Sequence, residues 1–242
     1  MQLKYKTMGR AFEKRKHKMF ARYDKMAKAF TRVGKEIAIA VKEGGDNPEY
    51  NPRLRAAVQN ARGVNMPKDR IEAAIKRASS KDTKGFEELT YEGYAPHGVA
   101  LIVECATDNP TRTVANVRMH FNKHNGSLGT SGSVSFQFER RGVFKFEIGD
   151  HDIEELELSL IDGGASDIEV EDDMVTVYTD FEDFGVMQKF LEEQSIETKS
   201  AELNYIPSNT IALENEKMDE VLELIEAFEA DDDVQKVSHN LE

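Results

Sequence analysis

The chain has 242 residues, of which 39% are apolar and 32% are charged, and its net charge is −13. This length accommodates two or three domains, and the periodic grouping of the apolar residues excludes a wholly disordered protein. A single cysteine, Cys105, excludes an internal disulfide framework and a cysteine-rich zinc site. No apolar run reaches the length of a membrane span and residues 1–7 lack the apolar core of a signal peptide, so we expect a cytoplasmic protein.

The charge is distributed very unevenly along the chain. Residues 1–81 hold 21 Lys and Arg against 8 Asp and Glu, whereas residues 82–242 hold 11 against 37. This asymmetry is typical of a protein with a nucleic-acid-binding end and an acidic body that avoids phosphate. The alternative is a lysine-rich surface that only keeps the protein in solution.

The first predicted helix lies within residues 8–45 and ends at Gly44-Gly45. Apolar residues recur along it at spacings of three or four, which gives one stripe for packing and leaves the cations on the other face. That stripe consists of Met26, Phe30, Val33, Ile37 and Val41. The cations that we expect to contact nucleic acid are Arg10, Lys14, Arg15, Lys16, Lys18, Arg22, Lys25, Lys28, Arg32, Lys35, Arg53 and Arg55.

Two further helices follow in this basic segment. Asn51-Pro52 is typical of an N-cap followed by proline at the first helical position, and Pro67 opens the next helix in a similar way. Cations of the third helix, at Lys68, Arg70, Lys76 and Arg77, are expected to point largely outward. A helix-turn-helix is one arrangement compatible with this spacing.

The composition becomes acidic and strand-like after about residue 82. We expect strands at residues 89–94 and 99–106, a helix from Asn109-Pro110 to about residue 124, and a strand at 133–138 that ends in a turn at 140–142. Next come a strand at 143–148, a helix at 152–161, strands at 168–171 and 175–178, a helix at 181–193 and a strand at 196–203. This β-α-β-β-α-β order is that of a ferredoxin-like unit.

The last segment contains Tyr205-Ile206, a helix around residues 218–228 and a strand at 234–237, which would complete the sheet begun at residues 89–138. We therefore predict an α+β multidomain protein, with a basic three-helix domain at residues 1–82. Two β-α-β-β-α-β sandwiches follow, one formed by residues 83–139 and 204–242, and an acidic one at residues 140–203 that is inserted into it.

Residues with catalytic or metal-binding chemistry form no convincing constellation. His120 and His124 have the spacing of paired metal ligands, but no carboxylate accompanies them as in HExxH, so they are interpreted as surface histidines. The glycine-rich loop at residues 126–133 lacks the ending of a phosphate-binding P-loop; it is a plain turn or touches a nucleic-acid backbone through its amides. Acidic runs such as Asp231-Asp232-Asp233 are interpreted as solvated faces and turns. We expect no enzyme, no metal, no cofactor and no small-molecule substrate.

Several short motifs resemble the YebC/PmpR family of bacterial regulators, which is related to the mitochondrial translational activator of cytochrome oxidase. The motifs lie throughout the chain from Gly9 onward, at residues 28–31, 51–55, 65–69, 75–77, 91–94, 98–99, 107–109, 112–113, 126–134 and 231–235. The resemblance implies a helical N-terminal domain followed by two α/β domains, one set within the other. It also implies non-enzymatic control of gene expression, through DNA or through the ribosome.

Three functions are consistent with these patterns. The first is a DNA-binding transcriptional regulator, the second is a translation factor that binds ribosomal RNA or the ribosome, and the third is a protein-interaction module whose basic end binds an acidic partner. DNA and RNA present the same phosphate charge, so composition does not choose between them. The predominance of Arg and Lys over Asn and Gln on the basic helices favours phosphate contacts over base readout.

Overall fold

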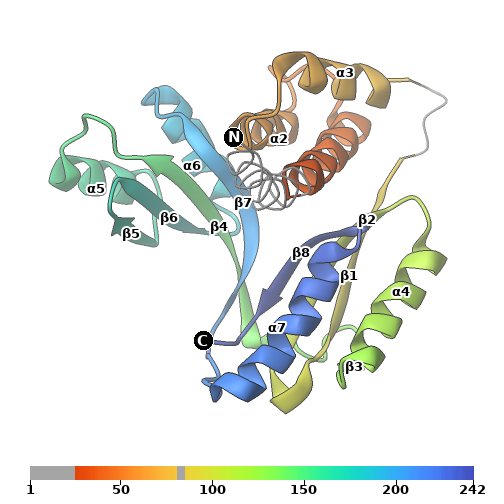
Figure 1. Ribbon diagram of the computed structural model, residues 1–242. Coiled ribbons are helices and arrows are strands. Elements are labelled where there is room, and N and C mark those ends of the chain that lie inside the picture. The colour runs from red at the N-terminus through yellow and green to blue at the C-terminus, as the bar shows by residue number, and fades with distance from the viewer. Residues whose placement is uncertain (1–24, 81–84) are drawn as a thin grey trace, which may run out of the picture.

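The computed structural model describes residues 25–80 and 85–242 of the protein (Figure 1). Residues 25–80 form a helical unit that consists of a first helix at residues 25–44, α2 (Pro52–Gly63) and α3 (Lys68–Ala78). The side chain of Asn51 caps α2 by accepting a hydrogen bond from the backbone N–H of Leu54, and Pro52 occupies the first turn, as predicted. The core of the unit is formed by Val33, Ile37, Ala40, Val41, Leu54, Ala57, Ala61, Met66, Ile71 and Ala78.

A second unit, which we call the central unit, is built on a four-stranded antiparallel sheet of order β3-β1-β2-β8. Its strands are β1 (Glu87–Tyr94), β2 (Ala100–Thr107), β3 (Ser127–Leu128) and β8 (Val234–His239). Helices α4 (Pro110–Lys123) and α7 (Asn215–Ala230) cover one face, where Phe121 and Phe228 pack edge to face against each other.

The third unit, the inserted unit, is a second antiparallel sheet of order β5-β6-β4-β7 with two helices. In chain order it contains β4 (Phe138–Glu147), α5 (Ile153–Asp162), β5 (Asp167–Glu171), β6 (Met174–Asp180), α6 (Phe184–Glu193) and β7 (Thr198–Pro207). The predicted α+β class is therefore confirmed, and this unit has the predicted β-α-β-β-α-β order. The central unit differs, because a turn around the 3-10 segment η1 (Pro96–Gly98) joins β1 directly to its neighbour β2, which gives the order β-β-α-β-α-β.

Two local predictions between residues 133 and 148 are wrong. Residues Ser135–Gln137 form a 3-10 turn, η2, instead of a strand, and β4 runs without a break through the predicted turn at residues 140–142. Gly142 is a close-packing position inside the strand, because a Cβ atom there would lie 2.3 Å from Oγ1 of Thr179 on β6. Likewise β7 continues through Tyr205 to Pro207, so the predicted domain limits at 139/140 and 203/204 fall inside two continuous strands.

The helical unit docks against β7, the edge strand of the inserted unit (Figure 1). The side-chain amide of Asn60 on α2 donates to the carbonyl of Ala201 at 3.1 Å and accepts from its N–H at 2.8 Å, so it satisfies one backbone position of the edge. Gly63 permits this approach, because a Cβ atom there would lie 1.8 Å from the carbonyl oxygen of Lys199. Among the described residues, no helix is both long and apolar enough to traverse a bilayer.

Candidate nucleic-acid interface

The predicted interface divides into a part outside the described residues and a part that the structure places. Six of the predicted cations lie outside the described residues, namely Arg10, Lys14, Arg15, Lys16, Lys18 and Arg22. The other six lie on the first helix and on α2, and the structure places them in two different situations.

The cations of the first helix share one stripe of its surface but not one environment. At 100° per residue, Lys25, Lys28, Arg32 and Lys35 fall within a narrow sector of the helix. Lys25 and Lys28 are exposed, whereas Arg32 donates through Nη2 to the carbonyl oxygen of Glu229 at 3.0 Å. That carbonyl belongs to the last turn of α7, the negative end of the helix dipole, where a cation is stabilising. The second half of the stripe thus docks the helical unit onto the central unit.

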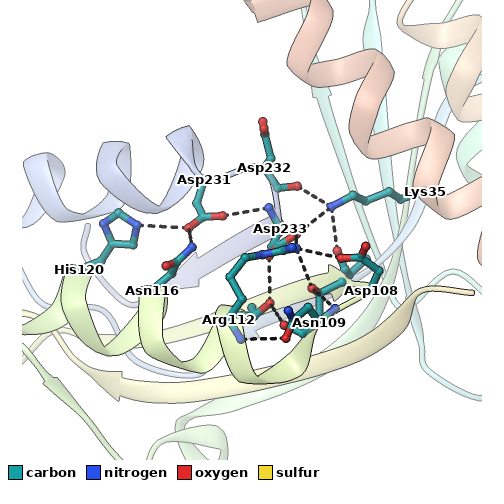
Figure 2. A network of polar contacts seen from close by, with 12 residues as sticks. Lys35, Asp108, Asn109, Arg112, Asn116, His120, Asp231, Asp232 and Asp233 are labelled. Atoms are coloured by element: carbon teal, nitrogen blue, oxygen red, sulfur yellow. Dashed lines mark hydrogen bonds and ion pairs between the residues drawn. The ribbon is translucent and has the colours of Figure 1, made fainter. Parts of the chain in front are cut away.

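Lys35 is the centre of this docking contact (Figure 2). The residue is only 8% exposed, and its Nζ donates to the carbonyl oxygens of Ala106 at 2.8 Å and Asp232 at 2.6 Å and to Oδ1 of Asp233 at 3.4 Å. An ammonium group has three N–H donors, so these acceptors use all of them. The prediction that Lys35 contacts nucleic acid is therefore corrected, because its ammonium group is buried and donates to acceptors within the protein.

Asp233 is the acceptor that joins several elements in Figure 2. Arg112 donates to it through Nη2 at 2.9 Å to Oδ1 and through Nε at 3.1 Å to Oδ2, and the hydroxyl of Thr113 donates at 2.9 Å. Burial alone would raise the pKa of the Asp233 carboxyl, but the hydrogen bonds from Arg112 and Thr113 and the charge of Lys35 lower it below its usual value. The run at residues 231–233 was predicted to be a solvated turn; Asp233 is instead a buried structural anion.

Arg53 and Arg55 of α2 also make contacts within the chain. Arg53 lies 2.6 Å from Glu43 of the first helix and 2.5 Å from Glu88 of β1. Arg55 donates through Nε to Glu192 of α6 at 3.1 Å. These two arginines therefore pair the helical unit with the central and the inserted unit, and the structure does not present them as unpaired cations for phosphate.

Other cations of the helical unit are exposed but were not among the predicted contacts. They are Lys42 on the first helix, Arg62 at the end of α2, and Lys68, Arg70, Lys76 and Arg77 on α3, and each is exposed to solvent. The guanidinium of Arg70 lies 5.9 Å from the ring centroid of Phe30, which joins α3 to the first helix. The helical spacing of the α3 cations already indicates that they point outward, although ten of the twelve predicted contacts lie before residue 36, where the cations are densest.

Backbone amides at the end of the glycine-rich loop already bind an anion of the protein itself. The carboxylate of Glu92 on β1 accepts hydrogen bonds from the backbone N–H groups of Gly132, Val134 and Ser135, each at 2.8 Å. Burial would raise the pKa of Glu92, but these backbone hydrogen bonds lower it. An internal anion thus uses these three amides, which are not free to bind a phosphate.

The histidine and cysteine residues singled out in the sequence lie in structural surroundings. No group of three His, Cys, Asp or Glu residues there is placed to hold a metal ion. His120 lies 3.3 Å from Asp231 and its ring packs edge-on against Phe228, which is a structural role. Burial, followed by the charges of Asp231 and Asp233, raises the pKa of the Cys105 thiol to about 12, so this cysteine is unreactive near neutral pH.

Two family models match this chain, one over its N-terminal segment and one over its α/β units. Residues 10–81 match the family model for the TACO1/YebC protein N-terminal domain, and residues 86–241 match the model for the TACO1/YebC second and third domain. The chain belongs to the TACO1/YebC family. A TACO1/YebC relative from Cytophaga hutchinsonii is 56% identical, with 97% of this chain and 98% of the relative covered. One from Myxococcus xanthus is 54% identical, with 97% and 100% covered.

A solved structure agrees with this TACO1/YebC fold. The crystal structure of a conserved hypothetical protein from Aquifex aeolicus superimposes with a TM-score of 0.79 at 39% identity, and covers 89% of this chain and 90% of that one. Both bacterial relatives carry the name probable transcriptional regulatory protein. The names in the TACO1/YebC family are thus those of regulators and not of enzymes.

Proposed function

We propose that this TACO1/YebC protein is a non-enzymatic, nucleic-acid-binding regulator of gene expression that contacts the phosphate backbone of DNA through its helical unit. The observation that carries the proposal is the segregation of charge. Within the described residues, the helical unit at residues 25–80 holds 12 Lys and Arg against 6 Asp and Glu, whereas the two sheet units at residues 85–242 hold 10 against 36. A polyanion is attracted to the first and repelled by the others, which orients the protein as it binds.

The surface proposed for phosphate contact is the exposed face of α3 together with the start of the first helix. It comprises Lys25, Lys28, Lys68, Arg70 and Lys76, which are all exposed. Arg32, Lys35, Arg53 and Arg55 hold the helical unit against the rest of the chain, so their role in binding is indirect: they fix the orientation in which this surface is presented. Lysine and arginine on a helix face contact phosphate without reading sequence, and we expect weak sequence preference.

The charge of the surface sets the salt dependence of binding. Five phosphate contacts on duplex DNA, one for each cation of this surface, give a loss of about 2.7 decades in affinity between 50 and 200 mM salt. Each cation that is removed should lower the slope of log affinity against log salt by about 1. An affinity that barely changes over this range would contradict phosphate contact as the source of binding.

The test compares two triple variants by fluorescence anisotropy with duplex DNA of mixed sequence. The first variant, Lys28→Ala with Arg70→Ala and Lys76→Ala, removes three charges from the proposed surface. Its matched control, Lys145→Ala with Lys189→Ala and Lys217→Ala, removes three exposed lysines from the sheet units. We expect the first to weaken binding and to lower the salt slope by about 3, and the control to leave both unchanged. Equal losses in both variants would refute the proposed surface.

A parallel experiment separates DNA from the ribosome as the target. The wild-type protein is sedimented with ribosomes at moderate salt and is applied to a column of chromosomal DNA under the same conditions. Retention on DNA without cosedimentation supports the transcriptional role. The opposite result is cosedimentation of the wild-type protein with ribosomes, lost in the first triple variant, and no retention on DNA. It would mean that the surface binds ribosomal RNA and not DNA, and it would overturn the transcriptional part of the proposal.

A further inference from the structure

Helix α5 of the inserted unit has aliphatic residues on both its inner and its outer face. Five of its ten residues are Leu or Ile, but only Leu156 and Leu160 are buried in the core of the unit. The other three are exposed to solvent: Leu158 is 67% exposed, Ile161 57% and Ile153 45%. A helix at the surface of a soluble protein is normally apolar on its inner face only. The outer face of α5 is therefore an apolar surface that is not covered by the part of the chain that the structure describes.

The two most exposed of these residues form one patch. Residues two positions apart are about 200° apart around a helix axis, so Leu158 lies opposite the buried Leu156 and Leu160. Ile161 follows Leu158 by three positions, and residues at this spacing are neighbours on the surface of a helix. Large apolar side chains that are exposed together and surrounded by polar ones mark sites of protein–protein contact.

The charges around this patch are negative. Residues 146–188 contain 15 Asp and Glu and no Lys or Arg. On α5 itself Glu154, Glu155 and Asp162 are exposed, and none of these three carboxylates has an ion-pair partner among the described residues. A partner that covers the patch must therefore bring positive charge as well as apolar side chains, because like charges across an interface are strongly unfavourable. The same repulsion disfavours a nucleic acid, and it disfavours a second copy of this face.

The position of α5 leaves its outer face accessible. In Figure 1, α5 and β5 lie at the end of the inserted unit that points away from the helical and the central unit. β5 is an edge strand, and its Asp167, Glu169 and Glu171 are exposed. Charged side chains on an edge strand oppose pairing with a further strand. The partner is therefore expected to dock on the helix and not on the edge of the sheet.

We propose that the outer face of α5 docks a lysine- or arginine-rich amphipathic segment of another protein. The segment places aliphatic side chains on Leu158 and Ile161. Its cations face Glu154, Glu155 and Asp162. Burial of the apolar side chains supplies affinity, and the surrounding charges select a basic partner over an acidic one. The inference does not depend on the nucleic-acid proposal.

The test uses a synthetic peptide of about 18 residues, made of leucine and lysine with the leucines at helical spacing. The control peptide has the same composition in an order without helical periodicity. Binding of each labelled peptide to the full chain is measured by fluorescence anisotropy at 150 mM salt, where exposed charges are screened beyond about 8 Å. We expect saturable binding of the periodic peptide at one site per chain, and at least tenfold weaker binding of the control. No binding of the periodic peptide, or equal binding of both, would overturn the proposal.

Apolar substitutions locate the contact. Leu158→Gln with Ile161→Gln should weaken binding of the periodic peptide at least tenfold. The matched control, Val186→Gln with Leu222→Gln, changes two exposed apolar residues on α6 and α7 and should bind as the wild type does. All four positions are exposed, so both variants should fold, which circular dichroism checks. Equal losses in the two variants would mean that the peptide has no preference for α5, and the proposal would be wrong.

Charge substitutions test the choice of partner. Glu154→Gln with Asp162→Asn removes two exposed charges next to the patch, and Glu223→Gln with Glu226→Gln removes two from α7, so the two variants have the same net charge. We expect the first variant to bind the periodic peptide at least threefold more weakly and the second to bind it as the wild type does. Equal weakening would show attraction to the acidic surface in general and would contradict docking on α5.

Discussion

The substitution Glu36→Gln should stabilise the protein in a pH-dependent way. Glu36 lies at the junction of the units, and burial followed by the charge of Glu202 raises its pKa from 4.5 to about 7. A carboxyl whose pKa is raised in the folded state costs stability when it is ionised. The cost is absent below pH 4.5, grows between pH 4.5 and 7, and is complete above pH 7.

The size of this effect follows from the shift. One pKa unit corresponds to about 1.4 kcal/mol, so the ionised carboxylate costs at most about 3 kcal/mol above pH 7. Glutamine has nearly the same shape, remains neutral, and keeps an oxygen that can accept the hydrogen bond from Asn60. The free energy of unfolding of the variant should therefore exceed that of the wild type by about 3 kcal/mol at pH 8 and by little at pH 4.5.

Urea unfolding at pH 4.5, 6, 7 and 8, followed by circular dichroism, measures this difference. Glu226→Gln, at an exposed position, serves as the control and should show no trend with pH. A difference between Glu36→Gln and wild type that is constant over the series, or a variant that is less stable at pH 8, would refute the reasoning from burial.

Four other substitutions test contacts between and within the units. Asp233→Asn removes the buried anion that Lys35 and Arg112 face, so it should lower the free energy of unfolding, measured in urea, by about 2–4 kcal/mol. A change below about 1 kcal/mol would mean that these contacts contribute no more than surface ion pairs do. Gly63→Ala should lower stability in the same assay, because its Cβ atom would collide with the Lys199 carbonyl oxygen. Gly34→Ala has nothing within 4 Å of the new Cβ atom and should raise stability by about 1 kcal/mol. Equal effects of the two substitutions would contradict the close approach of Gly63 to Lys199. Glu92→Gln should speed amide hydrogen exchange in the loop at residues 129–135, and unchanged protection there would show that the carboxylate does not order it.

Local sequence signals predicted most of the elements, because the features that begin and end helices are local. Asn51-Pro52 and Asn109-Pro110 start helices where predicted, and in both cases the asparagine side chain caps the helix. Gly142 was predicted to lie in a turn because glycine is common in turns. The structure requires glycine at this position for another reason, the close approach of Thr179, which lies 37 positions further along the chain.

The site was harder to predict than the fold, because residues far away in the sequence decide whether a cation is exposed or paired within the protein. Lys28 and Lys35 lie on the same stripe of one helix, and neither spacing nor composition distinguishes them. Lys35 differs from Lys28 because it is buried against Asp233, which lies 198 residues away in the sequence. The same holds for Arg55, whose partner Glu192 lies 137 residues away. Sequence patterns identified the basic unit but not which of its charges face outward.

Strands β4 and β7 pair from Phe138 opposite Pro207 to Phe146 opposite Thr198 and connect the inserted unit to the central one as a single ribbon (Figure 1). At one end of this ribbon, Phe138 and Tyr205 pack against Ala100 and Ile102, on the face of the central sheet opposite its helices. A twist applied to the inserted unit must therefore strain paired backbone along the whole ribbon and reach that aromatic anchor. The inserted unit is therefore held to the central unit by two hydrogen-bonded strands and not by two separate single-chain linkers.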